Sequence, residues 1–282
     1  MTSPLKRPIV IGGVVVAVVA AGAVALTMYN GREAAPVPAP ATAPEAPVNA
    51  TPAAAPFAFK ADSPYAEVEL KLPQSVKEQP ELHTRLFEAS VRDLRAFSEG
   101  SQADRSEAGG DPTSAPYQKL ITYDDDVETG HLFSLSRSAY EYTGGAHGMT
   151  TYTGVLWDKS LKQQITGASL LRKGADLDAA LCTAINAEKK RRDPAAETVG
   201  LKGKSDDMWS CPRAADTAFV LAAGTVPGKA GGLTFMVGPY VVGPYSDGAY
   251  MVNLPQSTIR GLIDPVYVDE FAGDPLPPAP AQ

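Results

Sequence analysis

The feature that most constrains this chain is an uncharged apolar run close to its N-terminus. Residues Ile9–Thr27 read IVIGGVVVAVVAAGAVALT, and a helix of this length, at about 1.5 Å per residue, just spans the hydrocarbon core of a bilayer. Lys6 and Arg7 precede the run, so the positive-inside rule leaves the short N-terminus in the cytoplasm. We therefore expect residues 1–30 to form a cytoplasmic stub and a signal anchor. The protein is then a single-pass protein of the bacterial cytoplasmic membrane, with its domain facing the periplasm or the exterior.

A cleaved signal peptide is the alternative interpretation of this run. Its cleavage site would be an A-x-A pattern, and Ala21-Gly22-Ala23 and Ala23-Val24-Ala25 match that pattern only weakly, because they lie inside the apolar run. No Cys stands directly after the run, which excludes a lipoprotein anchor. Both interpretations place the globular part outside the cytoplasmic membrane.

Proline marks the borders of the part that is expected to fold. Residues 31–56 hold 7 Pro and 10 Ala, and residues 275–282 hold 4 Pro. Proline lacks a backbone donor and favours extended geometry, so we expect a semi-rigid linker before the domain and a disordered tail after it. The intervening residues 57–274 are numerous enough to bury one sizeable core or two small ones.

The charge of the chain excludes some partners and favours others. The whole chain has a formal net charge of -7 and residues 57–274 carry -8, so no nucleic acid partner is expected. A basic partner fits this charge better. The densest acidic cluster is either a solvated turn or a face for such a partner, and it consists of Asp124, Asp125, Asp126 and Glu128.

The two cysteines, Cys182 and Cys211, lie 29 positions apart and form no C-x-x-C motif. In an oxidising, exported compartment we expect them to form a structural disulfide. A metal role for the two thiols is the alternative, but no His is close to either in sequence, and 2 Cys with 3 His are too few for a zinc-finger protein. We therefore assign no metal site and no cofactor.

The hydrophobic pattern predicts an α+β fold with helices packed on antiparallel sheet, because the regular alternation of a parallel α/β fold is absent. Polar residues 98–116 are expected to form a loop, and turns are expected at Asp125–Gly130 and Thr143–Gly148. The expected strands are Tyr65–Leu72, Tyr117–Asp124, His131–Tyr142, Met149–Asp158, Ala218–Ala222, Leu233–Val237 and Ala249–Leu254. The expected helices are Glu81–Phe97, Asp176–Arg191 and Gln256–Ile263. The basic run at 189–192 suits the negative end of a helix dipole.

Two motifs combine glycine with side chains that can carry function. The first lies at 140–148, YEYTGGAHG, where a glycine-rich turn presents His147 beside aromatic residues. Its candidate ligand-binding residues are Tyr142, Gly144, Gly145, His147 and Gly148. The alternative is a tight hairpin whose His hydrogen-bonds the neighbouring backbone.

The second motif lies at 238–250, GPYVVGPYSDGAY, and contains Gly-Pro-Tyr twice. Tyrosine offers a large contact area with a polar tip, so Tyr240, Tyr245 and Asp247 are candidate ligand-binding residues. The alternative is that the tyrosines pack on the sheet while the prolines stiffen the loop.

These motifs together carry a family resemblance. The segment YTGGAHG at 142–148, the Cys-bearing helix and the run GPYSDGAYMVNLP at 243–255 resemble the exported RsiV-like domain family. That family has no known function and often follows a PdaC-type N-terminal domain. The resemblance implies a PdaC-type α+β subdomain at 57–160 and an RsiV-like C-terminal subdomain at 161–274.

The resemblance also implies where the domain acts. The protein that gives the family its name is a membrane-anchored anti-sigma factor whose external domain binds lysozyme. Here the stretch before the apolar run is too short to hold a sigma factor. The deacetylase activity behind the name PdaC resides in a separate catalytic domain, and the His and Asp clustering that its metal needs is not found here. What carries over is a place in the cell envelope.

The leading hypothesis is a membrane-anchored binding module, not an enzyme, that recognises lysozyme or peptidoglycan-related ligands. One alternative is an envelope hydrolase with His147 as general base, oriented by Glu141 or Asp158. No G-x-S-x-G motif supports a serine nucleophile. A second alternative is a structural envelope stress factor with a membrane protein partner.

Overall fold

The computed structural model of this chain describes residues 54–107, 115–201 and 208–278. The expected signal anchor, nearly all of the linker and the last four residues of the tail lie outside these ranges. Within them, no helix is both long and apolar enough to cross a membrane. All described residues belong to one compact unit, Pro52–Gln282.

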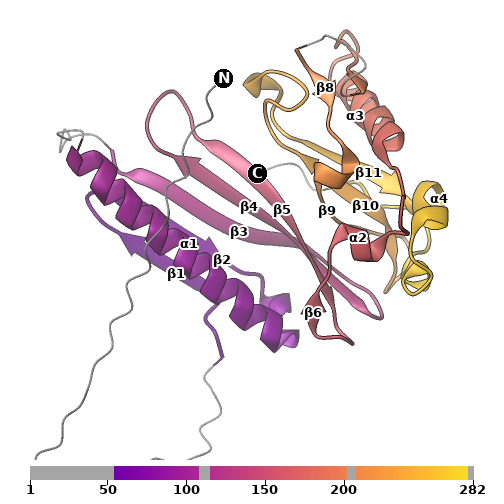
Figure 1. Cartoon of the computed structure of the whole chain (residues 1–282), viewed down its shortest axis with the longest axis horizontal. Coiled ribbons are helices and arrows are strands. Elements are labelled where there is room, and N and C mark those ends of the chain that lie inside the picture. Colours follow the sequence, from indigo (N-terminus) through magenta and orange to yellow (C-terminus); the bar gives the residue numbers. More distant parts are fainter. Residues whose placement is uncertain (1–53, 108–114, 202–207, 279–282) are drawn as a thin grey trace, which may run out of the picture. The chain divides into compact units, whose positions relative to one another are not determined.

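The fold is a mixture of α and β, built on two main sheets with a helix against each (Figure 1). The larger sheet has six strands in sequence order: β1 (Ala58–Asp62), β2 (Ala66–Lys71), β3 (Tyr117–Glu128), β4 (Leu132–Tyr142), β5 (Met149–Asp158) and β6 (Gln163–Gln164). The smaller has the order β11-β10-β9, with β9 (Ala218–Ala223), β10 (Ala230–Val237) and β11 (Tyr250–Pro255). The long strands and helices match the sequence prediction, whereas the short strands β1 and β6 were not predicted.

Helix α1 (Pro80–Glu107) packs on β2 and β3 and determines how those strands pair (Figure 1). The chain leaves β2, passes through this helix and enters β3 in the direction in which it ran through β2, so the two strands are parallel. Strands β3, β4 and β5 then form the expected antiparallel meander. The expectation of antiparallel sheet was therefore wrong at this pair, because a helical crossover, unlike a short turn, allows parallel pairing.

Two segments that were expected to be loops are partly regular structure. Helix α1 continues through residues 98–107, where Arg105 is buried and donates to the carbonyl oxygen of Ala115. Strand β3 likewise continues into the predicted turn at Asp125–Gly130 and ends at Glu128, with a bulge between Asp124 and Val127 that inserts an extra residue. The acidic cluster thus belongs to strand β3, and Glu128 pairs with Lys159.

Helix α3 (Asp178–Arg192) covers the smaller sheet and contacts β11. Short elements complete this part: helices α2 (Gly167–Leu170) and α4 (Gln256–Ile259), and the parallel pair β7 (Gly200–Leu201) and β8 (Ser210–Cys211). The 3-10 turns are Gln74–Glu78, Ala214–Asp216, Tyr245–Asp247, Arg260–Leu262 and Val268–Glu270. The ordered chain extends past residue 274, since the Leu276 amide donates to the carbonyl of Ala223.

The buried side chains form two clusters. One lies between α1 and the larger sheet and includes Leu70, Leu94 and Trp157. The other lies under α3 and includes Leu181 and Phe235. The two sheets approach closely at Gly154 of β5, where a Cβ atom would collide with the carbonyl oxygen of Phe219 in β9. Only glycine fits this approach, because it has no side chain.

Candidate functional site

The structure brings the two glycine-rich motifs together. The first forms the turn between β4 and β5, and the second forms the loop between β10 and β11. The ring of His147 stacks on that of Tyr245, with centroids 3.7 Å apart and planes at 13°. The ring of Tyr240 lies 5.5 Å from Tyr245 and 6.2 Å from His147. These three side chains form one aromatic cluster, although they come from positions about 100 residues apart.

The glycine-rich turn is shaped by its own residues. Gly144 and Gly145 have φ angles of 96° and 89°, a conformation that side chains disfavour. The Tyr142 hydroxyl donates to the carbonyl of Gly145 at 3.1 Å. Gly148 is buried against Tyr140, whose ring would collide with a Cβ atom there. Tyr142 and these glycines therefore support the turn, and the side chain that the turn presents is His147.

His147 is exposed, yet two hydrogen bonds orient its ring. Nδ1 lies 3.1 Å from the carbonyl oxygen of Gly148, and Nε2 lies 3.3 Å from the hydroxyl of Tyr240. The tautomer with hydrogen on Nδ1 satisfies both contacts, because Nε2 then accepts from the Tyr240 hydroxyl. The Tyr245 hydroxyl donates to the same Gly148 carbonyl at 3.0 Å. His147 thus bonds the backbone, as the hairpin interpretation expects, and its ring also joins an exposed aromatic cluster.

The carboxylates expected to orient His147 lie elsewhere. Glu141 pairs with the ammonium group of Lys119 at 2.6 Å. Asp158 is buried and accepts a hydrogen bond from the Tyr267 hydroxyl at 2.8 Å. Burial and this bond raise the pKa of Tyr267 to about 12. Among the described residues neither carboxylate hydrogen-bonds His147, so the proposed base lacks its orienting acid and the hydrolase arrangement is not formed.

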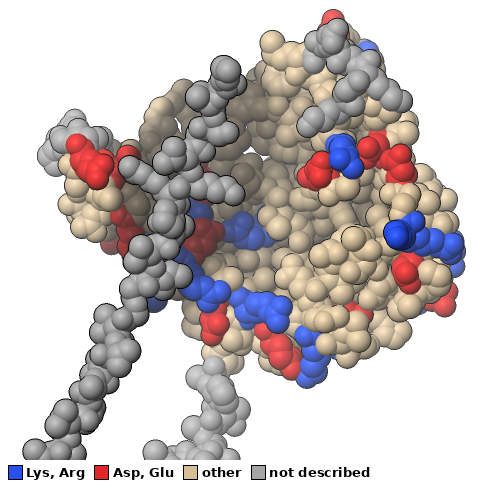
Figure 2. Space-filling view, in the orientation of Figure 1, with Lys and Arg blue, Asp and Glu red and all other residues tan. Residues whose placement is uncertain are grey.

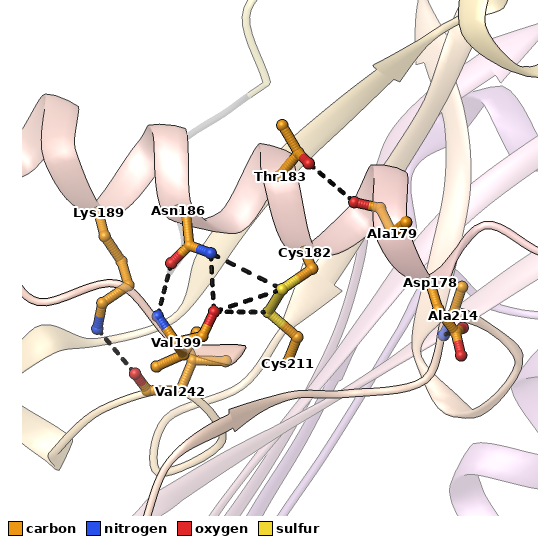
Figure 3. Close-up of a disulfide and its surroundings, with 10 residues drawn as sticks. All are labelled: Asp178, Ala179, Cys182, Thr183, Asn186, Lys189, Val199, Cys211, Ala214 and Val242. Atoms are coloured by element: carbon orange, nitrogen blue, oxygen red, sulfur yellow. Dashed lines mark hydrogen bonds between the residues drawn. A yellow bond between two sulfur atoms is a disulfide. The ribbon is translucent and has the colours of Figure 1, made fainter. Parts of the chain in front are cut away.

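Asp247 supports the loop from inside. Its carboxylate accepts from the Tyr250 hydroxyl at 3.3 Å and lies 3.8 Å from the ammonium group of Lys189. Lys189 is buried and donates to the carbonyl of Val242 at 2.8 Å (Figure 3). These bonds tie α3 to the loop that carries both tyrosines. Asp247 therefore acts in the structure as a positioning residue beside the aromatic cluster.

Arg192 at the end of α3 holds the same loop from the other side. Its Nη1 and Nη2 donate to the carbonyls of Asp247 and Ala249 at 3.0 and 2.9 Å. Its guanidinium lies over the ring of Tyr250, 4.1 Å from the centroid. Such a contact combines hydrogen bonds with cation–π attraction. The tip of the helix thus fixes the loop that presents Tyr245.

An open groove of about 1050 Å³ runs between α3 and strands β5 and β11, with Tyr245 in its wall. Sequence analysis did not identify the charged residues of this groove, because the basic run at 189–192 has an adequate explanation in the helix dipole. The lining residues are Thr150, Tyr152, Ala184, Ala187, Glu188, Arg191, Arg192, Pro239, Tyr245, Gly248, Ala249, Met251, Val252, Asn253, Pro277 and Pro278. The groove therefore joins an aromatic wall to a charged helix face.

Two titratable groups in the groove have shifted pKa values. The hydrogen bond from Arg191, assisted by Arg192, lowers the pKa of Glu188 despite its partial burial. Burial raises the pKa of the Tyr152 hydroxyl, and the nearby Tyr245 raises this pKa further. At neutral pH the groove thus presents the neutral phenol of Tyr152 together with the charged pair of Arg191 and Glu188.

The predicted disulfide is present and braces the helix that forms one wall of the groove. Cys182 of α3 is bonded to Cys211 of β8 (Figure 3). Next to it, Asn186 clamps Val199, accepting from its amide at 2.8 Å and donating to its carbonyl at 2.9 Å. Oxidised sulfurs cannot serve as thiolate ligands, so the alternative metal role for the cysteines is wrong. Across the described ranges, no cluster of His, Cys, Asp and Glu could hold a metal ion.

Comparisons with known proteins support part of the family resemblance. Residues 59–150 match the family model described as Deacetylase PdaC. No curated protein sequence matches the chain. The RsiV-like assignment of the C-terminal part stays a prediction.

Seven chains of solved structures are similar to this chain, among them the following two. One is a DUF3298 family protein from Pseudomonas aeruginosa PAO1, with 17% identity, covering 74% of this chain and 87% of that chain at a TM-score of 0.47. The other is a member of the DUF3298 family from Bacteroides fragilis NCTC 9343, with 16% identity, covering 73% of this chain and 88% of that chain at a TM-score of 0.48. Neither of these two proteins is described with an activity or a ligand.

Proposed function

We propose that this chain is a binding module of the cell envelope that holds a peptidoglycan-related glycan in the groove beside α3. The observation that carries the proposal is Tyr245, whose ring stacks on His147 and also lines the groove. Sugar rings present apolar C–H faces and polar edges, and the amphipathic side chain of tyrosine matches both. A groove of about 1050 Å³ has room for more than one sugar unit.

The orientation of Tyr245 before binding supports this function. The stack on His147, the hydrogen bond to the Gly148 carbonyl and the attachment of the loop to Arg192 all restrict the ring. A side chain that is already ordered loses less conformational entropy when a ligand binds. The cluster is thus prepared for contact with a ligand and needs no rearrangement.

Several features of the chain support a place in the envelope. The apolar run Ile9–Thr27 has the length of a membrane anchor, and the proline-rich stretch after it suits a spacer. The disulfide fits an oxidising, exported compartment. We include an RsiV-like C-terminal part in the proposal, on the strength of the glycine and tyrosine motifs at 142–148 and 243–255.

Lysozyme is the second candidate ligand, and the net charge favours it. Lysozymes are commonly basic, and residues 57–274 carry a formal charge of -8, which aids encounter with a basic protein. On the face shown in Figure 2, however, acidic and basic side chains are interspersed and form no single acidic patch. The groove therefore gives the glycan more specific support than the surface charge gives lysozyme.

A pull-down of the full chain in mild detergent, with purified peptidoglycan and separately with lysozyme, tests the proposal. We expect the chain to sediment with peptidoglycan and the variant Tyr245→Ala to lose most of that binding. Leu161→Ala is the matched control, since Leu161 is exposed in the turn after β5, at the opposite end of that strand from the groove. Binding to neither ligand at low salt contradicts the proposal. If the chain binds lysozyme but not peptidoglycan, and Tyr245→Ala leaves that binding unchanged, lysozyme replaces the glycan as the proposed ligand.

A further inference from the structure

The charge of the groove is opposite in sign to that of the domain around it. Arg191 and Arg192 supply two guanidinium groups to its lining, and Glu188 supplies one carboxylate. The surrounding residues 57–274 carry -8. An acidic surface repels an extended polyanion, while a local positive excess attracts a small anionic group that fits inside the groove. The groove therefore favours a ligand with one localised negative charge.

The two arginines have different tasks. All three nitrogen atoms of Arg192 already donate to the protein: Nε to Glu188 at 2.8 Å, and Nη1 and Nη2 to the carbonyls of Asp247 and Ala249. Its guanidinium also packs on Tyr250. Arg192 is thus a positioning residue for the loop, and it has little capacity left for a ligand.

Arg191 retains that capacity. Its side chain is 71% exposed, and Nε and Nη2 donate to the Glu188 carboxylate at 2.6 and 2.7 Å. A guanidinium has five N–H donors, and within the described part of the chain Nη1 of Arg191 has no hydrogen-bond partner. Glu188 thus holds the guanidinium in one orientation and leaves donors for an incoming anion. A planar, pre-oriented fork of this kind suits a carboxylate.

We infer that the groove recognises an acidic saccharide, whose sugar ring packs on Tyr245 while its carboxylate accepts hydrogen bonds from Arg191. This inference rests on the proposed function and adds the chemical class of the glycan. A neutral glycan needs only the aromatic wall and the polar side chains of the groove. An acidic one also uses Arg191, and for that reason binds more tightly.

Calorimetric titration of the full chain with two saccharides tests this inference. One probe is the disaccharide of N-acetylglucosamine and N-acetylmuramic acid, which has a carboxylate, and the other is the neutral tetramer of N-acetylglucosamine. We expect the acidic probe to bind about tenfold more tightly, as suits one charge-assisted pair at a partly exposed site. Its affinity falls as NaCl is raised, whereas that of the neutral probe does not.

Variants at neighbouring positions of α3 assign this preference to one side chain. We expect Arg191→Gln to lower the affinity for the acidic probe to that for the neutral probe. Arg191→Lys should keep part of the preference for the acidic probe. Lys190→Gln is the matched control, because it removes the same charge at a position that does not line the groove. Thermal unfolding of each variant checks that the fold is retained.

The outcomes separate the two proposals. The inference of an acidic ligand is overturned if both probes bind with equal affinity, Arg191→Gln leaves that affinity unchanged and Tyr245→Ala lowers it. The glycan site itself then stands. A loss of preference in Lys190→Gln as large as in Arg191→Gln overturns it as well, because the effect is then one of general charge. If neither probe nor peptidoglycan binds, the proposed function fails and the inference fails with it.

Discussion

The two buried clusters of this fold are stabilised in different ways. Under α1, the cluster between helix and sheet is made of aliphatic and aromatic side chains such as Leu70, Leu94 and Trp157. Beside α3, the second cluster is also apolar, but it is supplemented by a disulfide and by polar contacts, in which Lys189 and Arg192 hold the loop at 238–249. The candidate site depends on this second side, because the loop and the helix end form most of the groove, while the larger sheet contributes the turn with His147 and part of β5.

The difference shows what each kind of stabilisation can do. Apolar packing is non-directional and contributes much free energy, but it leaves the orientation of surface side chains open. Hydrogen bonds and a disulfide contribute less, yet they fix particular loops in particular positions. A binding site made of loop residues needs the second kind of support.

Removal of a buried side chain under α1 gives the largest expected loss of stability. Leu94 is fully buried, and Leu94→Ala should lower the free energy of unfolding by about 3–5 kcal/mol, since it deletes apolar contacts and leaves a cavity. Urea unfolding measures the change, with Val266→Ala, at 74% exposed, as a control that costs under about 0.5 kcal/mol. A loss below about 1 kcal/mol would show that this side is not held by packing.

Loss of the disulfide gives the next largest effect and separates the two sides. The double variant Cys182→Ser with Cys211→Ser opens a loop spanning 29 positions, which should cost about 3 kcal/mol. Hydrogen exchange should show reduced protection in α3 and the loop at 238–249, with α1 little changed. Equal loss of protection in α1 would mean that the two sides form one cooperative unit.

Glu270 links the two sides, and its effect depends on pH. It is buried and accepts hydrogen bonds from the Thr129 hydroxyl and from the amide and ring of His131. Burial alone raises the pKa of Glu270, but these bonds outweigh it and hold the pKa below its usual value of 4.5. The ionised carboxylate therefore stabilises the fold above pH 4.5, and the stabilisation disappears as pH falls through the lowered pKa.

The variant Glu270→Gln should therefore lose about 2 kcal/mol at pH 7, the range for hydrogen bonds to a charged group. The difference in the free energy of unfolding between this variant and the natural protein should narrow as the pH falls below 4.5. Urea unfolding at several pH values measures this gap. A gap that is constant from pH 7 to pH 3 would show that the charge of Glu270 contributes nothing.

Tyr245→Ala gives the smallest expected change in stability and separates binding from folding. Tyr245 is only half-buried, so we expect a loss of about 1 kcal/mol, together with at least a tenfold loss of glycan affinity. Parallel unfolding and titration measure both quantities. A loss of stability as large as that of Leu94→Ala would place Tyr245 in the core and remove it from the site.

Local patterns predicted much of the fold, and the failures have physical causes. Alternation and helical spacing identified β2, α1, the meander and α3, because each buries one face. They could not show the parallel pairing of β2 and β3, since pairing direction leaves no trace in local periodicity. They also ended α1 too early, because its last turns are polar and Arg105 is buried against the Ala115 carbonyl, a contact invisible in local sequence.

The sequence singled out the aromatic residues of the candidate site, but neither their arrangement nor the charged residues of the groove. His147, Tyr240 and Tyr245 stand out in the sequence and do meet in the structure. Glu141 and Asp158 were candidate partners of His147, yet each is bound to another residue, Lys119 and Tyr267. Arg191 carried no signal of its own, because a basic residue at a helix end already has an ordinary explanation.

The amino-acid sequence by itself determined the local elements, the glycine turns, the charge of the domain and the pair of cysteines. These depend on neighbouring residues and on composition, which sequence displays directly. Only the tertiary structure decided that α3, strands β5 and β11 and the loop at 238–249 enclose one groove, with Tyr245 in its wall and Arg191 on its helix face. Groups that lie far apart along the chain become neighbours through packing, and no local pattern encodes that proximity.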